Sequence, residues 1–330
     1  MEKKHIALIA GGDSDEYAVS MASAATIRKH IDAGRYTVHQ IVMRGKSWLY
    51  HADDGQTHPV DRNDFSVPLA DRRLCFDGVF ITIHGAPGED GRLQGYFDLL
   101  GIPYTTSGVL ASALTFNKYY CYQLVKGFGV ATPPSLLLDR SKDYSVSAIV
   151  AGLGLPLFVK PNEGGSSIGM SLVRREEELV PALELAFRHD RRVLLDTYLD
   201  GVELTCGVLS RMGQVLALPV TEIISKTKAT FFDYEAKYTP GAADEITPAR
   251  ISPGLTKTVQ NVSADLYKKL GMKGLVRFDY IACADALYFL EVNVTPGMTE
   301  TSIVPQQAAV LGISKKELFT ILIEEALAGR

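Results

Sequence analysis

The residues with the clearest potential for chemistry lie in the segment 275–294. Two runs rich in Val, Ile, Phe, Tyr and Leu, 275–282 and 286–294, are separated by a short Ala-Asp-Ala break, which predicts a β-hairpin. Side chains two residues apart share one face of a strand, and a hairpin centred on Asp285 opposes residues that lie equally far from it. One face of this hairpin would therefore carry Arg277 opposite Asn293, and Asp279 opposite Glu291.

Opposed carboxylates on this face require a compensating charge. Like charges that face each other destabilise a sheet, and a buried carboxylate is costly unless it is paired. A divalent cation would remove the conflict, and a few oxygen ligands suit Mg²⁺, which completes its shell with water and substrate phosphates. The alternative is a solvated hairpin face with an Arg277–Asp279 pair. The apolar flanks and the Thr-Pro-Gly-Met-Thr sequence that follows favour the metal site, with Asp279, Glu291 and Asn293 as ligands.

A second candidate is the carboxylate of Glu16. The apolar run Ile6–Ala10 predicts a buried parallel strand, and GGDSDE then leads into a helical pattern that continues to about His30. Asp13 and Glu16 have the spacing of a capping box, which would give Glu16 a purely structural role. The functional alternative is a carboxylate at a strand–helix junction, where α/β sheets bind ligands, positioned to hold an ammonium group.

Two glycine-rich loops are further candidates. The predicted strand 78–83 ends in HGAPGEDG, which makes His84 either a structural residue or part of a site. The loop 164–171 has nearly the spacing of a P-loop, but Met170 replaces the required lysine and a strand-like run follows. This loop is therefore interpreted as a mobile cover whose backbone N–H groups hold phosphates, with an ordinary hairpin turn as the alternative.

The remaining pattern predicts a mixed α/β chain. A helical stretch is expected at 107–127, and helix 175–189 is charged and amphipathic. Segment 225–250 has no clean period and several aromatics, which predicts a functional docking loop. Successive strands of one antiparallel sheet are expected at 193–198, 203–210 and 215–224. Further strands are expected at 135–138, 155–160 and 169–173, and further helices at 92–100, 254–270, 302–311 and 314–328.

Composition narrows the functional classes. The formal net charge of −4 argues against general nucleic-acid binding. The cysteines are scattered without metal-binding spacing, which is typical of a reduced, cytosolic protein. The apolar run near the N-terminus is too short for a signal peptide, and no segment approaches the length of a membrane span.

Taken together and in order, several motifs resemble those of the D-alanine–D-alanine ligases of the ATP-grasp superfamily. The resemblance covers nearly the whole chain, and the joint order of the motifs is far more specific than any one of them. One difference is that Asp196 stands where a glutamate is frequent. The motifs are GGDSDEYAVS, HGAPGEDG, FNK at 116–118, VKPNEGGSSIGMS, FFDYEAKY and RFD…EVNVTPGMTETS.

The resemblance implies roles for individual residues. Glu16, helped by His84, would bind the ammonium group of the first D-alanine, and Ser166 and Tyr238 would link two mobile loops to Glu16. Arg277 and the backbone N–H of Gly297 would stabilise a tetrahedral oxyanion, and Ser302 with the backbone of Ile303 would bind the carboxylate of the second D-alanine. The residues implied in nucleotide binding are Lys118, Lys160, Ser167, Asp196, Glu203 and Lys237.

The resemblance also implies an architecture and an activity. The fold would be a three-domain ATP-grasp architecture, with a parallel-sheet domain at 1–106, a small central domain at 107–195 and a domain carrying the metal and substrate site at 196–330. The activity would be ATP-dependent joining of two D-alanines through an acyl phosphate for peptidoglycan synthesis, with two Mg²⁺ ions (or Mn²⁺), in a cytoplasmic homodimer. D-lactate or D-serine as acceptor, and a nucleotide-binding protein without catalysis, are the competing hypotheses.

Overall fold

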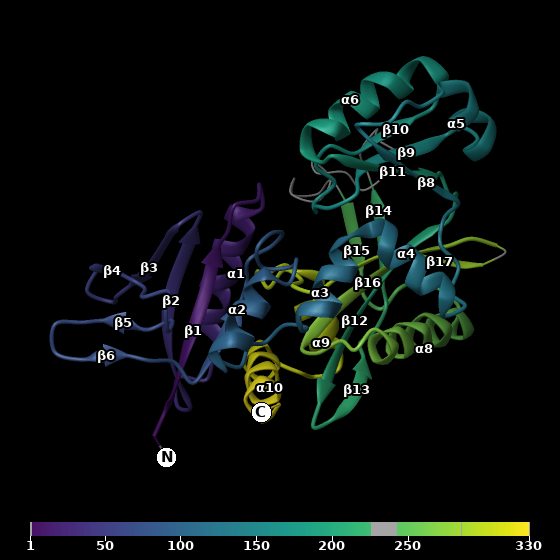
Figure 1. Ribbon diagram of the computed structural model, residues 1–330. Coiled ribbons are helices and arrows are strands. Elements are labelled where there is room, and N and C mark those ends of the chain that lie inside the picture. The colour runs from purple at the N-terminus through teal and green to yellow at the C-terminus, as the bar shows by residue number, and fades with distance from the viewer. Residues whose placement is uncertain (1, 226–242, 285, 330) are drawn as a thin grey trace.

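The computed structural model describes residues 2–225, 243–284 and 286–329. Three sheets follow one another along the chain, and each has helices packed on it (Figure 1). This mixed α/β architecture agrees with the fold class predicted from the sequence.

The N-terminal sheet has the strand order β4-β3-β2-β1-β7. Its centre is parallel, as predicted, because β1 pairs in parallel with both β2 and β7. The edge strands β3 and β4 are antiparallel, since two residues between β2 and β3 are too few for a crossover connection. A small β5–β6 ribbon follows. The bounds are β1 Lys4–Gly11, β2 Tyr36–Arg44, β3 Ser47–His51, β4 Thr57–Pro59, β5 Val67–Pro68, β6 Arg73–Leu74 and β7 Gly78–Ile81.

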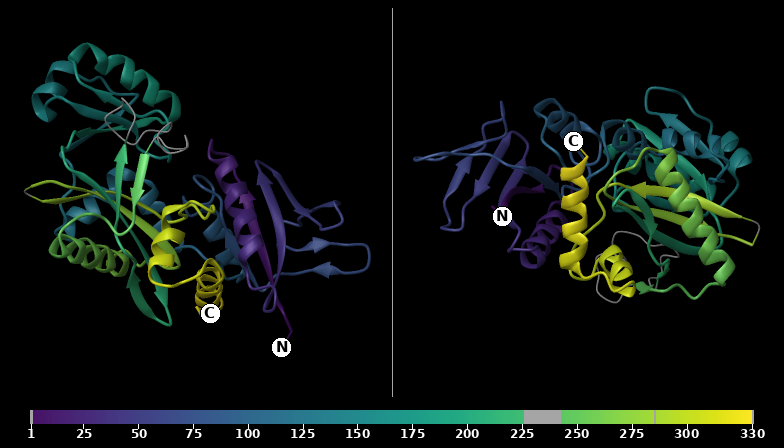
Figure 2. Two further views of the ribbon diagram at one scale, coloured as in Figure 1. Left: turned by 180° about the vertical axis from the view of Figure 1, so that it is seen from behind. Right: turned by 90° about the horizontal axis from the view of Figure 1, so that it is seen from below.

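Helices cover both faces of this sheet. Adjacent β1 residues enter different cores: Leu8 packs with α1 (Tyr17–His30) and α10 (Lys315–Ala328), whereas Ile9 packs with α2 (Arg92–Leu100). A parallel sheet needs this cover because its strands are apolar on both faces. The last helix, α10, therefore lies between the first sheet and the rest of the chain (Figure 2).

The predicted helical stretch 107–127 is two helices, α3 (Val109–Phe116) and α4 (Lys118–Gly127). Asn117 interrupts it with an extended backbone, φ −87° and ψ 101°. The Asn117 side chain accepts a hydrogen bond from the Tyr120 N–H at 3.1 Å, so it caps α4. The break allows Lys118 to begin a helix directed at the pocket described below.

The middle sheet is antiparallel, with the order β10-β9-β11-β8. Apolar residues of its strands pack against α5 and α6 in one core that includes Val159, Leu183 and Val193. The short 3₁₀ helix η1 precedes α6, which accounts for the predicted helix 175–189. The bounds are β8 Ser135–Asp139, α5 Val146–Leu153, β9 Leu157–Pro161, β10 Ser171–Val173, η1 Glu176–Glu178, α6 Leu179–His189 and β11 Arg192–Thr197.

The third sheet has the order β15-β14-β12-β16-β17, with β13 also paired to β12. Helix α8 packs on it, and α9 follows it in the chain. The bounds are β12 Val202–Arg211, β13 Gln214–Ala217, β14 Thr221–Ser225, β15 Ala243–Ile246, α8 Pro253–Lys269, β16 Leu275–Ala282, β17 Leu287–Asn293 and α9 Ile303–Val310.

Two sequence predictions about these strands are wrong. The runs expected to form one antiparallel sheet are divided, because β11 pairs with β8 and β9 whereas β12 pairs with β16. The run 215–224 is interrupted at Pro219, which has no N–H for a ladder hydrogen bond, so β13 and β14 are separate. The segment 225–250 also contains β15, although 226–242 lies outside the described residues.

The predicted domain boundaries remain predictions. The division at 195/196 falls within β11, and the last helix packs against the first sheet. Among the described residues, no helix has the length and apolar character needed to cross a membrane.

Candidate active site

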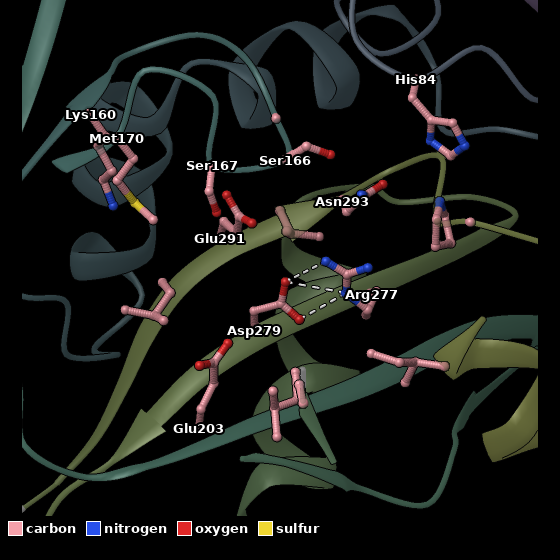
Figure 3. A pocket seen from close by; sticks show the side chains of 18 of the residues that line it. His84, Lys160, Ser166, Ser167, Met170, Glu203, Arg277, Asp279, Glu291 and Asn293 are labelled. Carbon is pink, nitrogen blue, oxygen red and sulfur yellow. Dashed lines mark hydrogen bonds and ion pairs between the residues drawn. The ribbon is translucent and has the colours of Figure 1, made fainter. Parts of the chain in front are cut away.

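The hairpin of β16 and β17 has the predicted register around its polar face. Arg277 pairs with Asn293, and Asp279 pairs with Glu291. All four residues line one pocket, and Figure 3 shows their side chains together beneath the loop that carries Ser166 and Ser167. The prediction that this face collects an arginine, two carboxylates and an amide is confirmed.

Beyond Asp279 the register shifts by one residue. Tyr280 pairs with Phe289, so Leu290 is the extra residue of a β-bulge. The predicted symmetric hairpin is therefore wrong for its outer half, and Asp285 at its centre lies outside the described residues. The bulge lets Tyr280 and Phe289 remain fully buried in the core while the carboxylates stay on the pocket side.

Arg277 and Asp279 form a forked ion pair. Arg277 Nε lies 2.9 and 3.2 Å from the two carboxylate oxygens of Asp279, and Nη2 lies 2.7 Å from one of them. The side chains are only 18% and 10% exposed, so this pair is not on a solvated face as the alternative interpretation required. Burial has the largest single effect on the Arg277 guanidinium and lowers its pKa, but the charge and hydrogen bonds of Asp279, together with the charges of Glu291 and Glu89, outweigh burial and raise the pKa.

The predicted metal ligands suit a magnesium ion that shares its shell with a substrate. Asp279 and Glu291 are directly opposed on neighbouring strands, and Asn293 Oδ1 already accepts the Thr295 N–H at 2.9 Å. Within the described ranges, no group of three or more His, Cys, Asp or Glu side chains could hold a metal alone. Two carboxylates and an amide fit Mg²⁺ only if water and phosphate oxygens supply the remaining ligands, which is how Mg²⁺ binds in nucleotide sites.

Lys118, at the start of α4, reaches the same pocket. Its Nζ donates to the carbonyl oxygen of Gly164 at 2.6 Å and lies 3.8 Å from Glu291 Oε2. Its side chain is 12% exposed. One cation thus connects the glycine-rich loop to the predicted metal-binding strand.

A network around Lys160, on β9, forms another part of the pocket. Lys160 Nζ lies 2.5 Å from Asp196 Oδ2 and donates to the hydroxyl of Tyr122 at 3.3 Å. The Tyr122 hydroxyl donates to the same Asp196 oxygen at 3.0 Å. Asp196 Oδ1 is buried and has no hydrogen-bond partner within the described part of the chain. The sequence analysis did not identify Tyr122, because a tyrosine inside an apolar helix carries no motif.

The loop from 164 to 169 connects β9 and β10 and faces the pocket. Ser166 and Ser167 adopt left-handed backbone conformations, with φ 49° and 57°. Such values are uncommon for residues with a side chain and require support from neighbouring contacts. Ser166 Oγ donates to Glu16 Oε1, so the loop is held against the N-terminal part of the chain.

Glu16 has the contacts of a site residue and not those of a capping box. It is the N-cap residue of α1, but its side chain makes no capping hydrogen bond. Asp13 accepts from the Gly45 N–H at 2.6 Å. The capping-box interpretation is therefore wrong, since both carboxylates are directed to other partners.

His84 is buried beside Glu16, at the end of the N-terminal sheet. Its side chain lines the pocket, and its Nε2 has no hydrogen-bond partner among the described residues. Burial lowers the pKa of the His84 imidazole, although the charge of Glu16 opposes the shift. The imidazole is therefore neutral at pH 7, with a ring nitrogen available to a ligand.

Glu89 is a residue that the sequence analysis missed. It is buried in the loop after β7, and its oxygens accept the N–H groups of Gly85 at 2.8 Å and Thr295 at 3.2 Å. Burial, followed by the charge of Glu16, raises the pKa of Glu89 to about 8. Its place in the HGAPGEDG motif was the available signal, but its partner Thr295 could not be inferred from the motif.

The far end of the pocket contains Gly297, Ser302 and Ile303. Ser302 precedes α9, and its hydroxyl accepts the Thr299 N–H at 2.9 Å instead of capping the helix. The Ser302 side chain therefore does not cap α9, and a helix N-terminus of this kind can bind an anion.

One pocket of about 1340 Å³ joins these parts. Lys237 and Tyr238 lie outside the described residues. The structure brings together all other predicted site residues along the wall of this pocket: Glu16, His84, Lys118, Lys160, Ser166, Ser167, Asp196, Glu203, Arg277, Asp279, Glu291, Asn293, Gly297, Ser302 and Ile303.

Family models account for most of the sequence. A model described as "D-ala D-ala ligase N-terminus" matches residues 5–107, and one described as "D-ala D-ala ligase C-terminus" matches residues 124–324. The chain belongs to the D-alanine–D-alanine ligase family. A family member from Bacteroides fragilis is 45% identical over 323 residues, which are 98% of this chain and 99% of that protein. One from Parabacteroides distasonis is 45% identical over 99% of both chains.

Solved structures of the family have the same fold. D-alanyl-alanine synthetase A from Vibrio cholerae superposes with a TM-score of 0.89 at 27% identity and covers 100% of both chains. The VanG D-Ala:D-Ser ligase from Enterococcus faecalis has a TM-score of 0.86 at 33% identity, with 98% of this chain and 100% of that chain covered. The fold and family predicted from the sequence are confirmed.

Proposed function

We propose that this chain joins two D-alanine molecules into D-alanyl-D-alanine, with conversion of ATP to ADP and phosphate, for peptidoglycan synthesis. The observation that carries the proposal is the single pocket in which Glu16, the lysines, the metal-ligand set and Arg277 meet. The two ends of the pocket would bind oppositely charged groups. The Glu16 carboxylate at one end would bind an ammonium group, and the backbone N–H groups at the start of α9 at the other end would bind a carboxylate. Family membership supports the same activity.

The nucleotide would occupy the cleft between the middle and third sheets. Lys118 and Lys160 would neutralise its phosphates, and loop 164–169, with Ser167, would cover them. Asp196, whose Oδ1 lacks a partner among the described residues, and Glu203 would bind the adenosine. Lys237, outside the described residues, would approach the γ-phosphate.

Asp279, Glu291 and Asn293 would hold Mg²⁺, with two ions expected and Mn²⁺ as a substitute. Bound there, the metal would neutralise charge on the β- and γ-phosphates during phosphoryl transfer. Arg277 forms an ion pair with Asp279 beside these ligands, so the buried Asp279 carboxylate is not left unpaired. Asp279, Glu291 and Arg277 together carry a net negative charge that would attract the metal ion.

The first step requires a carboxylate oriented toward the γ-phosphate. Glu16 and neutral His84 would fix the ammonium end of the first D-alanine, and an oxygen of its carboxylate would take the phosphoryl group to give an acyl phosphate. Ser166 holds its loop against Glu16, which would exclude water from this hydrolysable intermediate. Tyr238, outside the described residues, would add a second link.

In the second step the amine nitrogen of the second D-alanine attacks the acyl carbon. The C–N bond forms, phosphate then leaves with the electron pair of the C–O bond, and the proton that the amine loses passes to the departing phosphate. Arg277 and the Gly297 N–H would stabilise the intervening oxyanion, and Ser302 with the Ile303 N–H would hold the acceptor carboxylate.

A phosphate-release assay with ATP and Mg²⁺, with and without D-alanine, tests the function. The expected result is release that depends on D-alanine, with D-alanyl-D-alanine as the product and no release with L-alanine. ATP binding without D-alanine-dependent turnover would overturn the proposal. D-serine and D-lactate belong in the same assay because one related structure is a D-Ala:D-Ser ligase.

Three further assignments belong to the proposal. The chain would act as a homodimer in the cytoplasm, which sedimentation and cell fractionation would test. Its domains would divide at 106 and 195, although β11 spans the second boundary.

A further inference from the structure

The turn between β17 and α9 has an unusual pattern of backbone hydrogen bonds. Thr295 donates its N–H to Asn293 Oδ1 and Glu89 Oε1, Met298 donates to Ser23 Oγ, and Thr299 donates to Ser302 Oγ. Pro296 has no N–H. Within the described residues, Gly297 is then the one position of 295–299 whose N–H has no protein partner, and Gly297 lines the pocket.

Two of these acceptors come from distant parts of the sequence. Glu89 is 206 residues from Thr295, and Ser23, on α1, is 275 residues from Met298. Both side chains are buried, with 7% and 0% exposure, so their contacts with the turn do not compete with bulk water. The N-terminal sheet and its helix thus hold both sides of Gly297.

A surface contact holds the same segment farther along. Glu300 Oε1 lies 2.8 Å from both Lys29 Nζ and His30 Nε2 at the end of α1, and Lys315 Nζ also pairs with Glu300. These side chains are partly exposed, so the pairs contribute little individually. Their position matters more, because α1 contacts the turn through Ser23 and again through its last residues.

We propose that Ser23 and Glu89 are positioning residues, which orient the turn 295–299 so that the Gly297 N–H points at the reacting carbonyl oxygen. This inference rests on the proposed function, since it concerns the oxyanion formed when the second amine attacks. The physical basis is that a donor stabilises an oxyanion only within a narrow range of distance and angle.

The same arrangement connects, through α1, the two groups that would hold the first D-alanine, because the carbonyl oxygen that becomes the oxyanion belongs to that molecule. Glu16 precedes the helix and would bind the first substrate, and Ser23 lies seven residues later, about 10 Å along the axis. A rigid helix of this length sets the separation between the first ammonium group and the oxyanion donor. Glu89 adds a second connection, since the loop that carries it begins at His84.

Ser23→Ala is the most direct test, with Ser20→Ala as its matched control. Both serines are buried on α1, and each accepts one backbone N–H, from Met298 at 3.1 Å and from Gly11 at 2.9 Å. Each variant therefore loses one buried backbone-to-hydroxyl bond, Ser20→Ala also loses a longer contact of 3.5 Å with the Thr82 hydroxyl, and only Ser23→Ala frees the turn. Ser23→Thr, which retains a hydroxyl, should recover activity if its methyl group is accommodated.

The readout compares ligation with reversible formation of the acyl phosphate. Positional isotope exchange in labelled ATP reports the first step, and dipeptide formation reports the whole reaction. Ser23→Ala should lower the rate of ligation about tenfold or more, with a limit near the 10²–10³-fold cost of losing an oxyanion donor. Exchange and the KM for ATP should remain close to wild type, so the ratio of exchange to ligation should rise.

Other outcomes separate the possible failures. An unchanged ratio in Ser23→Ala, or the same change in Ser20→Ala, would overturn the positioning role. A general loss of folding would reduce both steps together, and Glu89→Gln then provides the second variant, with the same expected rise in the ratio. Wild-type protein that forms no dipeptide would contradict the proposed function itself.

Discussion

Replacing Arg277 by alanine should separate nucleotide binding from peptide-bond formation. Arg277 donates three hydrogen bonds to Asp279. The phosphates are expected to bind to lysines and not to Arg277. Loss of one oxyanion donor typically lowers kcat by about 10²–10³, or about 2.7–4 kcal/mol. We therefore expect ligation to fall by this factor while the Kd for ATP changes little.

The substitution should also destabilise the fold. Removing one partner of a buried ion pair typically costs about 3–5 kcal/mol, because the remaining charge is left uncompensated. Asp279 is only 10% exposed, so solvent can offset little of this cost. Bound Mg²⁺ should recover part of it, so thermal unfolding of Arg277→Ala should depend more strongly on Mg²⁺ than that of wild type.

The assay combines ATP titration, thermal unfolding and single-turnover dipeptide formation. Arg277→Lys is the matched variant, because it keeps the charge but lacks the planar fork. It should be more stable than Arg277→Ala and yet remain impaired in ligation. Wild-type turnover in a folded Arg277→Ala protein would refute the role of this side chain, and loss of ATP binding alone would assign it to the nucleotide site.

Three other perturbations follow from the same contacts. Ser166→Ala removes a hydrogen bond to the charged Glu16, worth about 1.5–3 kcal/mol, and should raise the KM for the first D-alanine roughly 10- to 100-fold in steady-state kinetics; an unchanged KM would mean that the loop closes without this bond. Asn293→Ala should raise the Mg²⁺ concentration that gives half-maximal turnover, and an unchanged Mg²⁺ titration would remove Asn293 from the ligand set. Burial, then His5, lowers the pKa of His39 from 6.5 to about 4. Below pH 6.5 the unfolded chain binds more protons at this residue than the folded protein does. The free energy of unfolding should therefore be about 2.5 kcal/mol lower at pH 4.5 than it is above pH 6.5. Urea unfolding monitored through the single Trp48 would measure this, and His39→Gln with the same pH dependence would contradict it.

Local sequence patterns predicted much of the fold. The pairing of Asp279 with Glu291 followed from alternation and a short break, because strand periodicity determines which side chains share a face. The glycine-rich loops were located because few other residue types tolerate their backbone conformations. The outer half of the hairpin was not predicted, since the bulge at Leu290 depends on how Phe289 and Tyr280 pack in the core.

Contacts between distant segments were harder to predict from the sequence. The bond between Ser166 and Glu16 agrees with the family resemblance, but the residues themselves carry no sign of it. Tyr122 and Ser23 sit at buried helical positions, where a polar side chain has no recognisable motif. Their partners became identifiable only when three sheets were placed around one pocket.

The amino-acid sequence by itself determined the family, most helices and strands, and the inventory of charged groups at the pocket. These depend on residue type and spacing over short distances. Tertiary structure alone decided that β11 and β12 enter different sheets, that α10 covers the first sheet, and that Ser23 and Glu89 hold the turn at Gly297. The physical reason is that a buried hydrogen bond requires two groups to meet in three dimensions, and nothing in either local segment encodes where its partner will lie.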